Sequence, residues 1–379
     1  MTLNENKGVS IKTMLMVGGA YASYTIGSGF ATGQEVLQFF GSWGHPLQYA
    51  TVLVSMIMTI YFTSSCYKTG QRMSFDNASD CYRYYCGKYV GYFFDFFSLI
   101  LVFGILISMF AGCGSTIEQY FGIPKYVGAV GMGIVAAIVV MSGLRRVEQV
   151  LGFLGVVIIG YVIIIGIYAA ATSGTNFAEA TANLPQYVEE GAVLQAGVFG
   201  IKHWFLSALT YGGVCLIVSV PFLVSLGKGT KNQGEALAGG IFSGIFFHAG
   251  VLLVVVAVLF NLDSIVQNGA QVPLLAAMQN MMPKIAWTFA IVLVLGIFTT
   301  VIGYLWLVSG RFAEDKSKKQ RIIVACLVVA GVFGGSIIPF NLIINVLYPF
   351  AGFCGVVFCI FIIARDIRNA SAKKKEIAE

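Results

Sequence analysis

The segment Ile26-Gly27-Ser28-Gly29-Phe30-Ala31-Thr32-Gly33-Gln34-Glu35 lies in the middle of the first long apolar stretch of the chain. Each of its three glycines weakens a helix by roughly 1 kcal/mol relative to alanine, so the segment predicts a break in a helix. Inside a bilayer, non-helical backbone is tolerated only where protein buries it or where it lines a cavity. The segment therefore predicts a solute or ion site within a membrane.

Composition sets the class of protein. The chain has 379 residues, of which 58% are hydrophobic and only 11% are charged, and this excludes an ordinary soluble globule. A helix needs about 20 apolar residues to cross the hydrocarbon core. We predict an all-α polytopic membrane protein with about ten transmembrane helices, at 13–40, 46–67, 90–117, 124–143, 149–172, 198–226, 237–260, 283–309, 321–338 and 342–364.

Basic residues indicate the orientation, because they collect on the cytoplasmic side of short loops. Lys7 and Lys12 precede the first span, Arg145 and Arg146 join the fourth and fifth spans, and further basic residues occupy the tail 365–379. We expect a multi-pass protein of the plasma (inner) membrane with both termini cytoplasmic. The net charge of +6 thus reflects topology in a lipid bilayer and not affinity for nucleic acid.

The number of spans predicts an inverted repeat. Residues 1–172 would form the first repeat, 173–197 an external loop, 198–364 the second repeat and 365–379 a cytoplasmic tail. Because five is odd, the second repeat would start on the opposite side of the membrane, and helices 1 and 6 would both be discontinuous. Gly212-Gly213, near the centre of the sixth span, predicts the second break, although glycine pairs also serve ordinary helix packing.

The string IGSGFATGQEVLQFF (26–40), the ten spans and the chain length resemble the YkvI-type bacterial membrane proteins of the amino acid-polyamine-organocation superfamily, which has the LeuT fold. The stretch 26–30 is also similar to the one with which amino acid transporters of that superfamily hold substrate carboxylates. The resemblance covers essentially the whole chain and implies secondary transport.

The first break also predicts a substrate site on physical grounds. Free N–H groups of the half-helix after the break could hold a carboxylate, and carbonyls of the preceding half-helix suit an ammonium, so a zwitterion fits both. Aromatic rings could cap the ammonium, or simply pack. The alternative is that 27–33 is a tight helix-packing surface. Our candidate substrate-binding residues are Gly27, Ser28, Gly29, Phe30, Ala31, Thr32, Phe103, Ala208, Thr210 and Tyr211.

The eighth span carries Gly296, Thr299 and Thr300 at spacings that place one carbonyl and two hydroxyls on one helix face. In LeuT-fold sodium symporters this site is completed by two carbonyls from the first break, and the resemblance implies Ser23 and Ile26 as those partners. Five oxygens suit a hard cation such as Na⁺. Alternatively, the threonine hydroxyls bond only the preceding turn. No lysine lies between Gln149 and Thr172, where some proton-coupled relatives place one, and this favours Na⁺ as the coupling ion. We expect no other cofactor.

Ionisable residues inside a membrane are candidates for function. Glu35 and Lys202 could form an outer gate, Glu35 could carry a coupling proton, or Glu35 could be a locally bonded structural carboxylate. For Asp95, a gate or ion pair at the inner side is expected rather than substrate contact. Residues 263–283 contain Pro273 and an apolar run too short to cross the bilayer, which predicts a lid over the outer vestibule.

These features predict a secondary active transporter, with Na⁺-coupled symport of a small amino acid or related organic solute by alternating access. A proton-coupled carrier or exchanger and a non-transporting solute sensor on the same fold remain alternatives. An enzyme is disfavoured, since the three histidines lack metal-ligand spacing and no nucleophile-base arrangement occurs. A pore is disfavoured because charge rings and filter motifs are absent.

Overall fold

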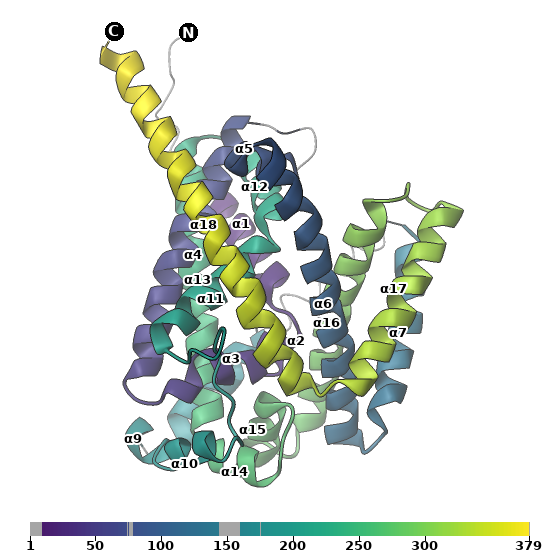
Figure 1. Cartoon of the computed structure of the whole chain (residues 1–379). Helices are drawn as coiled ribbons and strands as arrows, with labels where there is room; N and C mark the ends of the chain where they lie inside the picture. The colour runs from purple at the N-terminus through teal and green to yellow at the C-terminus, as the bar shows by residue number, and fades with distance from the viewer. Residues whose placement is uncertain (1–9, 74, 76–78, 144–159, 175, 379) are drawn as a thin grey trace.

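The computed structural model describes residues 10–73, 75, 79–143, 160–174 and 176–378, and the described residues are helices and connecting loops without a strand. Long helices form a bundle, with shorter helices gathered at one end of it (Figure 1). Six helices are long and apolar enough to cross a membrane: α4 (Leu47–Met73), α6 (Lys88–Phe121), α13 (Gln233–Leu259), α16 (Ala286–Gly310), α17 (Lys318–Ile337) and α18 (Phe340–Ala378).

The other four predicted spans correspond to shorter or interrupted helices. The first comprises α1 (Ile11–Thr25), α2 (Ser28–Ala31) and α3 (Gln34–Phe39), and the sixth comprises α11 (Trp204–Ile217) and α12 (Val220–Lys228). The fourth is α7 (Lys125–Met141), and the fifth is described from residue 160 as the helix Gly160–Thr172. The first part of the fifth predicted span, 149–159, and Arg145 and Arg146 lie outside the described residues.

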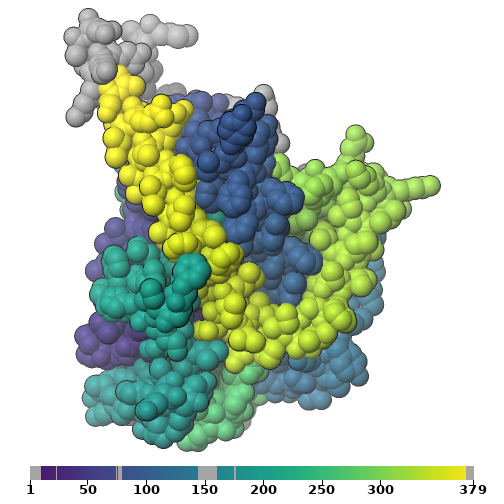
Figure 2. Space-filling model, in the orientation of Figure 1, coloured from purple at the N-terminus to yellow at the C-terminus, as the bar shows by residue number. Residues whose placement is uncertain are grey.

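The two ends of the bundle differ (Figure 1). One end carries both chain termini and α5 (Asp80–Cys86), and we call it the termini end. The opposite end carries the 3₁₀ turn η1 (Gly41–Trp43) and the short helices α9 (Phe177–Ala180), α10 (Leu184–Glu189), α14 (Leu262–Gln267) and α15 (Pro273–Met281), and we call it the capped end. The last turns of α18 project beyond the bundle at the termini end (Figure 2).

The segment expected to form a lid lies at the capped end. Residues 263–283 form α14 and α15 instead of a span, with Pro273 in the first turn of α15. The backbone N–H of Leu274 donates to the carbonyl of Thr32 at 2.8 Å, and Leu274 is fully buried. α15 therefore rests directly on the first break.

Candidate functional site

The break predicted at 26–33 is confirmed. α1 ends at Thr25, Ile26 and Gly27 are extended, and the single turn of α2 follows. Gly33 then adopts a left-handed conformation (φ +80°) before α3 begins. A side chain there would be strained, and its Cβ would lie 3.1–3.2 Å from Leu274 of the lid. The first span thus has two interruptions separated by one helical turn.

Glu35 turns back from the first turn of α3 into this break. Its side chain is only 5% exposed, and its Oε1 accepts a hydrogen bond from the Tyr211 hydroxyl on α11 at 2.9 Å. A Cβ built on Gly29 would overlap Glu35 Oε2 and lie 2.9 Å from its Cδ. The carboxylate therefore lies against the glycine of the break, and Gly29 provides the space for it.

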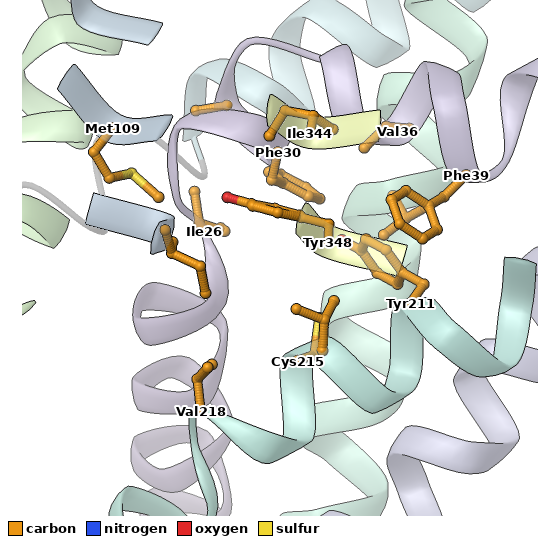
Figure 3. Close-up of a cluster of buried hydrophobic side chains, with 14 of the residues drawn as sticks. Ile26, Phe30, Val36, Phe39, Met109, Tyr211, Cys215, Val218, Ile344 and Tyr348 are labelled. Carbon is orange, nitrogen blue, oxygen red and sulfur yellow. The ribbon is translucent and has the colours of Figure 1, made fainter. Parts of the chain in front are cut away.

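A small cavity of about 30 Å³, which we call the central cavity, borders the break. Among the described residues that line it, Glu35 carries the only carboxylate. In Figure 3 the Tyr348 ring extends from α18 towards the loop that carries Ile26, and Tyr211 lies beside Phe39. The described lining residues come from six helices, the first break and the bend after α11: Tyr24, Thr25, Gly27, Glu35, Ile105, Met109, Val214, Cys215, Val218, Tyr304 and Tyr348.

A larger cavity of about 540 Å³, which we call the vestibule, lies towards the termini end and includes Ser79, Asp95 and Arg311 in its lining. The vestibule shares Tyr24 and Val218 with the central cavity. The Tyr24 hydroxyl donates to the Val218 carbonyl at 3.0 Å, and its ring stacks on Phe222 of α12 at a centroid distance of 4.3 Å. Tyr24 therefore separates the two cavities, while α15 covers the break from the capped end.

The second break is real, but its predicted position is wrong. Gly212 and Gly213 lie inside the continuous helix α11, where a Cβ on Gly213 would overlap the Gly352 carbonyl of α18. The chain bends by 61° between α11 and α12, around Val218 and Ser219. Pro221 explains this position, because proline lacks the N–H donor and its ring clashes with the carbonyl four residues earlier. The glycine pair instead permits close helix packing.

Of the residues predicted for Na⁺, Ile26 and Thr300 make contact where α1 ends beside α16. The Thr300 hydroxyl donates to the Ile26 carbonyl at 3.3 Å, and the Thr299 hydroxyl donates to the Gly296 carbonyl at 2.7 Å. Both threonines are buried. Ser23 lies in α1 one turn before the break, and its side chain is outside the described residues. The oxygens expected to hold Na⁺ thus lie in adjacent elements, and both hydroxyls bond carbonyls in this arrangement.

Other predicted substrate residues are separated from the cavity. Among the described residues, Ser28 to Thr32 are buried in the break, and Tyr211 reaches Glu35. Ala208 is buried in α11 but absent from the cavity lining, and Thr210 bonds back to Leu206 at 2.9 Å. Phe103 packs against the core, and its neighbours Ile105 and Met109 line the cavity instead.

The predicted outer gate pair of Glu35 and Lys202 is wrong for this structure. Lys202 is exposed in the loop before α11, whereas Glu35 is buried against Tyr211. In the described parts of the chain, the ion pairs are Arg83 with Asp80 and Arg311 with Asp95. Asp95 thus makes the expected ion pair at the edge of the vestibule.

Sequence reasoning missed three tyrosines of the central cavity, Tyr24, Tyr304 and Tyr348. Tyr304 follows Thr300 by one helical turn and so shares its face, a signal that was available. Tyr24 directly precedes the break, and Tyr348 directly precedes Pro349 within α18. Their convergence required the packing of α1, α16 and α18.

No family model matches the chain. The chain is 22% identical over 339 residues to the membrane protein YkvI of Bacillus subtilis, covering 89% of this chain and 92% of the relative. It is 25% identical over 356 residues to the protein YyaD of the same organism, covering 90% and 92%.

Among solved structures, a substrate-bound, outward-open Na⁺-coupled sialic acid symporter superposes with a TM-score of 0.51 at 14% identity, covering 92% of this chain and 83% of the symporter. That structure is a transporter and not an enzyme, and at this identity the likeness concerns the fold. The resemblance stated from the sequence is confirmed: this is a multi-pass helical membrane protein with the LeuT fold, similar along most of its length to the YkvI-type membrane proteins.

Proposed function

We propose that the protein is a secondary active transporter that moves a small amino acid or related organic solute by alternating access through the central cavity. The observation that carries this proposal is the buried break in the first span, whose cavity adjoins a vestibule on one side and is covered by α15 on the other. Irregular backbone at membrane depth is the site that LeuT-type carriers use for solutes. Because α15 covers the break at the capped end and the vestibule adjoins the cavity at the termini end, a solute would enter the cavity from the termini end in this structure.

The proposal includes the topology. The halves 1–172 and 198–364 act as inverted repeats, 173–197 is an external loop and 365–379 is a cytoplasmic tail. Basic residues at the termini end, such as Arg83 in α5 and Arg311 directly after α16, support a cytoplasmic location for that end, in the plasma (inner) membrane. The vestibule then opens to the cytoplasm.

Na⁺ is our proposed coupling ion. An ion held by the Ile26 carbonyl and the Thr300 hydroxyl would join α1 to α16, and coupling needs only that ion and solute stabilise the same state. Glu35 favours a second candidate, coupling to protons, because it places a titratable carboxyl in the cavity. These two modes differ in the gradient that drives uptake.

Flux into proteoliposomes tests the function. We expect purified protein to accumulate a labelled solute from a panel of amino acids and amines when a Na⁺ gradient is imposed, and not when K⁺ replaces Na⁺. Accumulation driven by a proton gradient alone would assign the second mode. Solute binding without any flux would contradict transport and indicate a sensor.

A further inference from the structure

We propose that the solute is an amine cation without a carboxylate, whose cationic nitrogen binds between the Glu35 carboxylate and the tyrosine rings once the central cavity, about 30 Å³ in this structure, has widened to admit it. This inference rests on the proposed function and narrows its substrate class. It departs from the zwitterion that the glycine-rich break alone predicts.

The first step concerns the place that a substrate carboxylate would occupy. Glycines in the break allow a ligand to approach the backbone, but here the Glu35 carboxylate lies directly against Gly29. The protein thus fills this space with its own negative group. A second carboxylate brought to the same backbone would be repelled, because like charges at short range interact strongly in a low-dielectric site.

The second step concerns the missing counter-charge. Glu35 is 5% exposed, and the partner of its Oε1 is the neutral hydroxyl of Tyr211. The titratable groups that face it across the cavity are Cys215 on α11 and the tyrosines of α1, α16 and α18, which are neutral at physiological pH. No basic side chain of the described residues lines the cavity. A buried carboxylate without a cation is costly, so the cavity is suited to receive one.

The third step concerns the kind of cation. Three tyrosines, Tyr24, Tyr304 and Tyr348, line the same cavity as Glu35, with apolar Ile105, Met109 and Val214 between them. Aromatic faces attract ammonium groups, and this attraction grows when the site excludes water. The Tyr24 hydroxyl is engaged by Val218, and the Tyr348 hydroxyl lies 3.1 Å from Ser108 Oγ. Two of the three ring hydroxyls are therefore engaged by other groups, and the aromatic and apolar surface beside the carboxylate suits an organic ammonium better than a bare metal ion.

The test compares ligands that differ in one group. Binding to purified protein is measured by calorimetry for three sets: alanine and ethylamine; leucine, 3-methylbutylamine and 3-methylbutanol; choline and its uncharged analogue 3,3-dimethylbutan-1-ol. A wider panel of primary to quaternary amines of up to eight carbons follows. We expect the amine in each set to bind at least 10-fold more tightly than every other member of its set, whether that member carries a carboxylate or no charge. Tighter binding of the amino acids, or binding by none of the amines, would overturn the proposal.

Variants assign the effect to the carboxylate. Glu35→Gln keeps an acceptor for Tyr211 but removes the charge, and should weaken binding of the best amine at least 10-fold. Glu118→Gln removes an exposed carboxylate of α6 at the capped end and should leave affinity unchanged. Tyr211→Phe keeps the charge, and so should weaken binding less than Glu35→Gln. Unchanged amine affinity in a folded Glu35→Gln protein would overturn the assignment.

The failure of this inference can be distinguished from failure of the proposed function. If the Glu35→Gln variant still transports an amino acid, the proposed transport function stands and the amine is not the solute class. If amines bind in a Glu35-dependent way but no flux is measured, the ligand class stands and the proposed transport function is contradicted.

Discussion

The two helix breaks of this molecule are built in different ways. The first combines extended residues, a single turn and the left-handed Gly33, and it holds a buried carboxylate. The second is a short bend of 61° before Pro221, where the Ser219 hydroxyl donates to the Cys215 carbonyl at 2.6 Å. The first break therefore offers a carboxylate to a ligand, whereas the carbonyls of the second are occupied by side-chain hydroxyls, those of Ser219, Tyr24 and Tyr82. We infer that the first break binds the solute and that the second acts mainly as a bend.

The strongest prediction concerns Gly29. A methyl group there would displace the Glu35 carboxylate. Gly29→Ala should therefore reduce solute flux about 100-fold or more, as expected when a positioned binding group is misplaced. Thermal stability should change little, because the displaced group is the end of a flexible side chain. Flux into proteoliposomes and thermal unfolding measure the two effects. The matched control is Gly19→Ala, where no atom lies within 4 Å of the built Cβ and flux should be normal. Equal flux in both variants would show that the break needs no such space.

The next prediction concerns Gly213, the glycine that the sequence suggested as a break. Its built Cβ overlaps the Gly352 backbone, which cannot move without shifting α18, so Gly213→Ala should lower stability by about 1–3 kcal/mol. Solute affinity of the folded fraction should fall less than in Gly29→Ala, because a shift of α18 moves Tyr348 but leaves the Glu35 carboxylate in place. A stable variant with lost affinity would instead place the solute at Gly212-Gly213.

The smallest of these effects is expected at Thr300. Removing a hydroxyl that contacts the Ile26 carbonyl should weaken the apparent Na⁺ affinity about 10-fold, the loss of one charge-assisted contact. Uptake measured against Na⁺ concentration gives this value for Thr300→Ala. Thr288→Ala, at a half-buried threonine near the start of the same helix, serves as the control. Na⁺ dependence that is the same in both variants would favour the purely structural role of Thr300.

The sequence was sufficient where one local signal determines the structure. Clustered glycines identified the first break, and Pro273 with a short apolar run identified the lid. The predicted position of the second break was wrong because the prediction relied on Gly212-Gly213 and not on Pro221, although proline is the stronger helix breaker. Sequence reasoning also failed for tertiary geometry. Counting along the chain placed Lys202 near Glu35, but α11 begins only at Trp204 and leaves Lys202 in an exposed loop.

The cavity itself was the least predictable part. Tyr24, Tyr304 and Tyr348 are separated by up to 324 positions and meet only through the packing of α1, α16 and α18. Tyrosine is common in this chain, with 18 copies, so composition could not single these three out. Only the position of Tyr304, one turn after Thr300, carried a local signal.

The central claim is that the solute binds at the first break and not at the second. Backbone hydrogen exchange, followed by mass spectrometry with and without the best-bound amine of the panel, tests it directly, because bound ligand should protect the amides that surround it. We predict a larger increase in protection in peptides covering 27–35 than in those covering 212–221, where Val214, Cys215 and Val218 also line the cavity. Protection confined to 212–221 would contradict the claim.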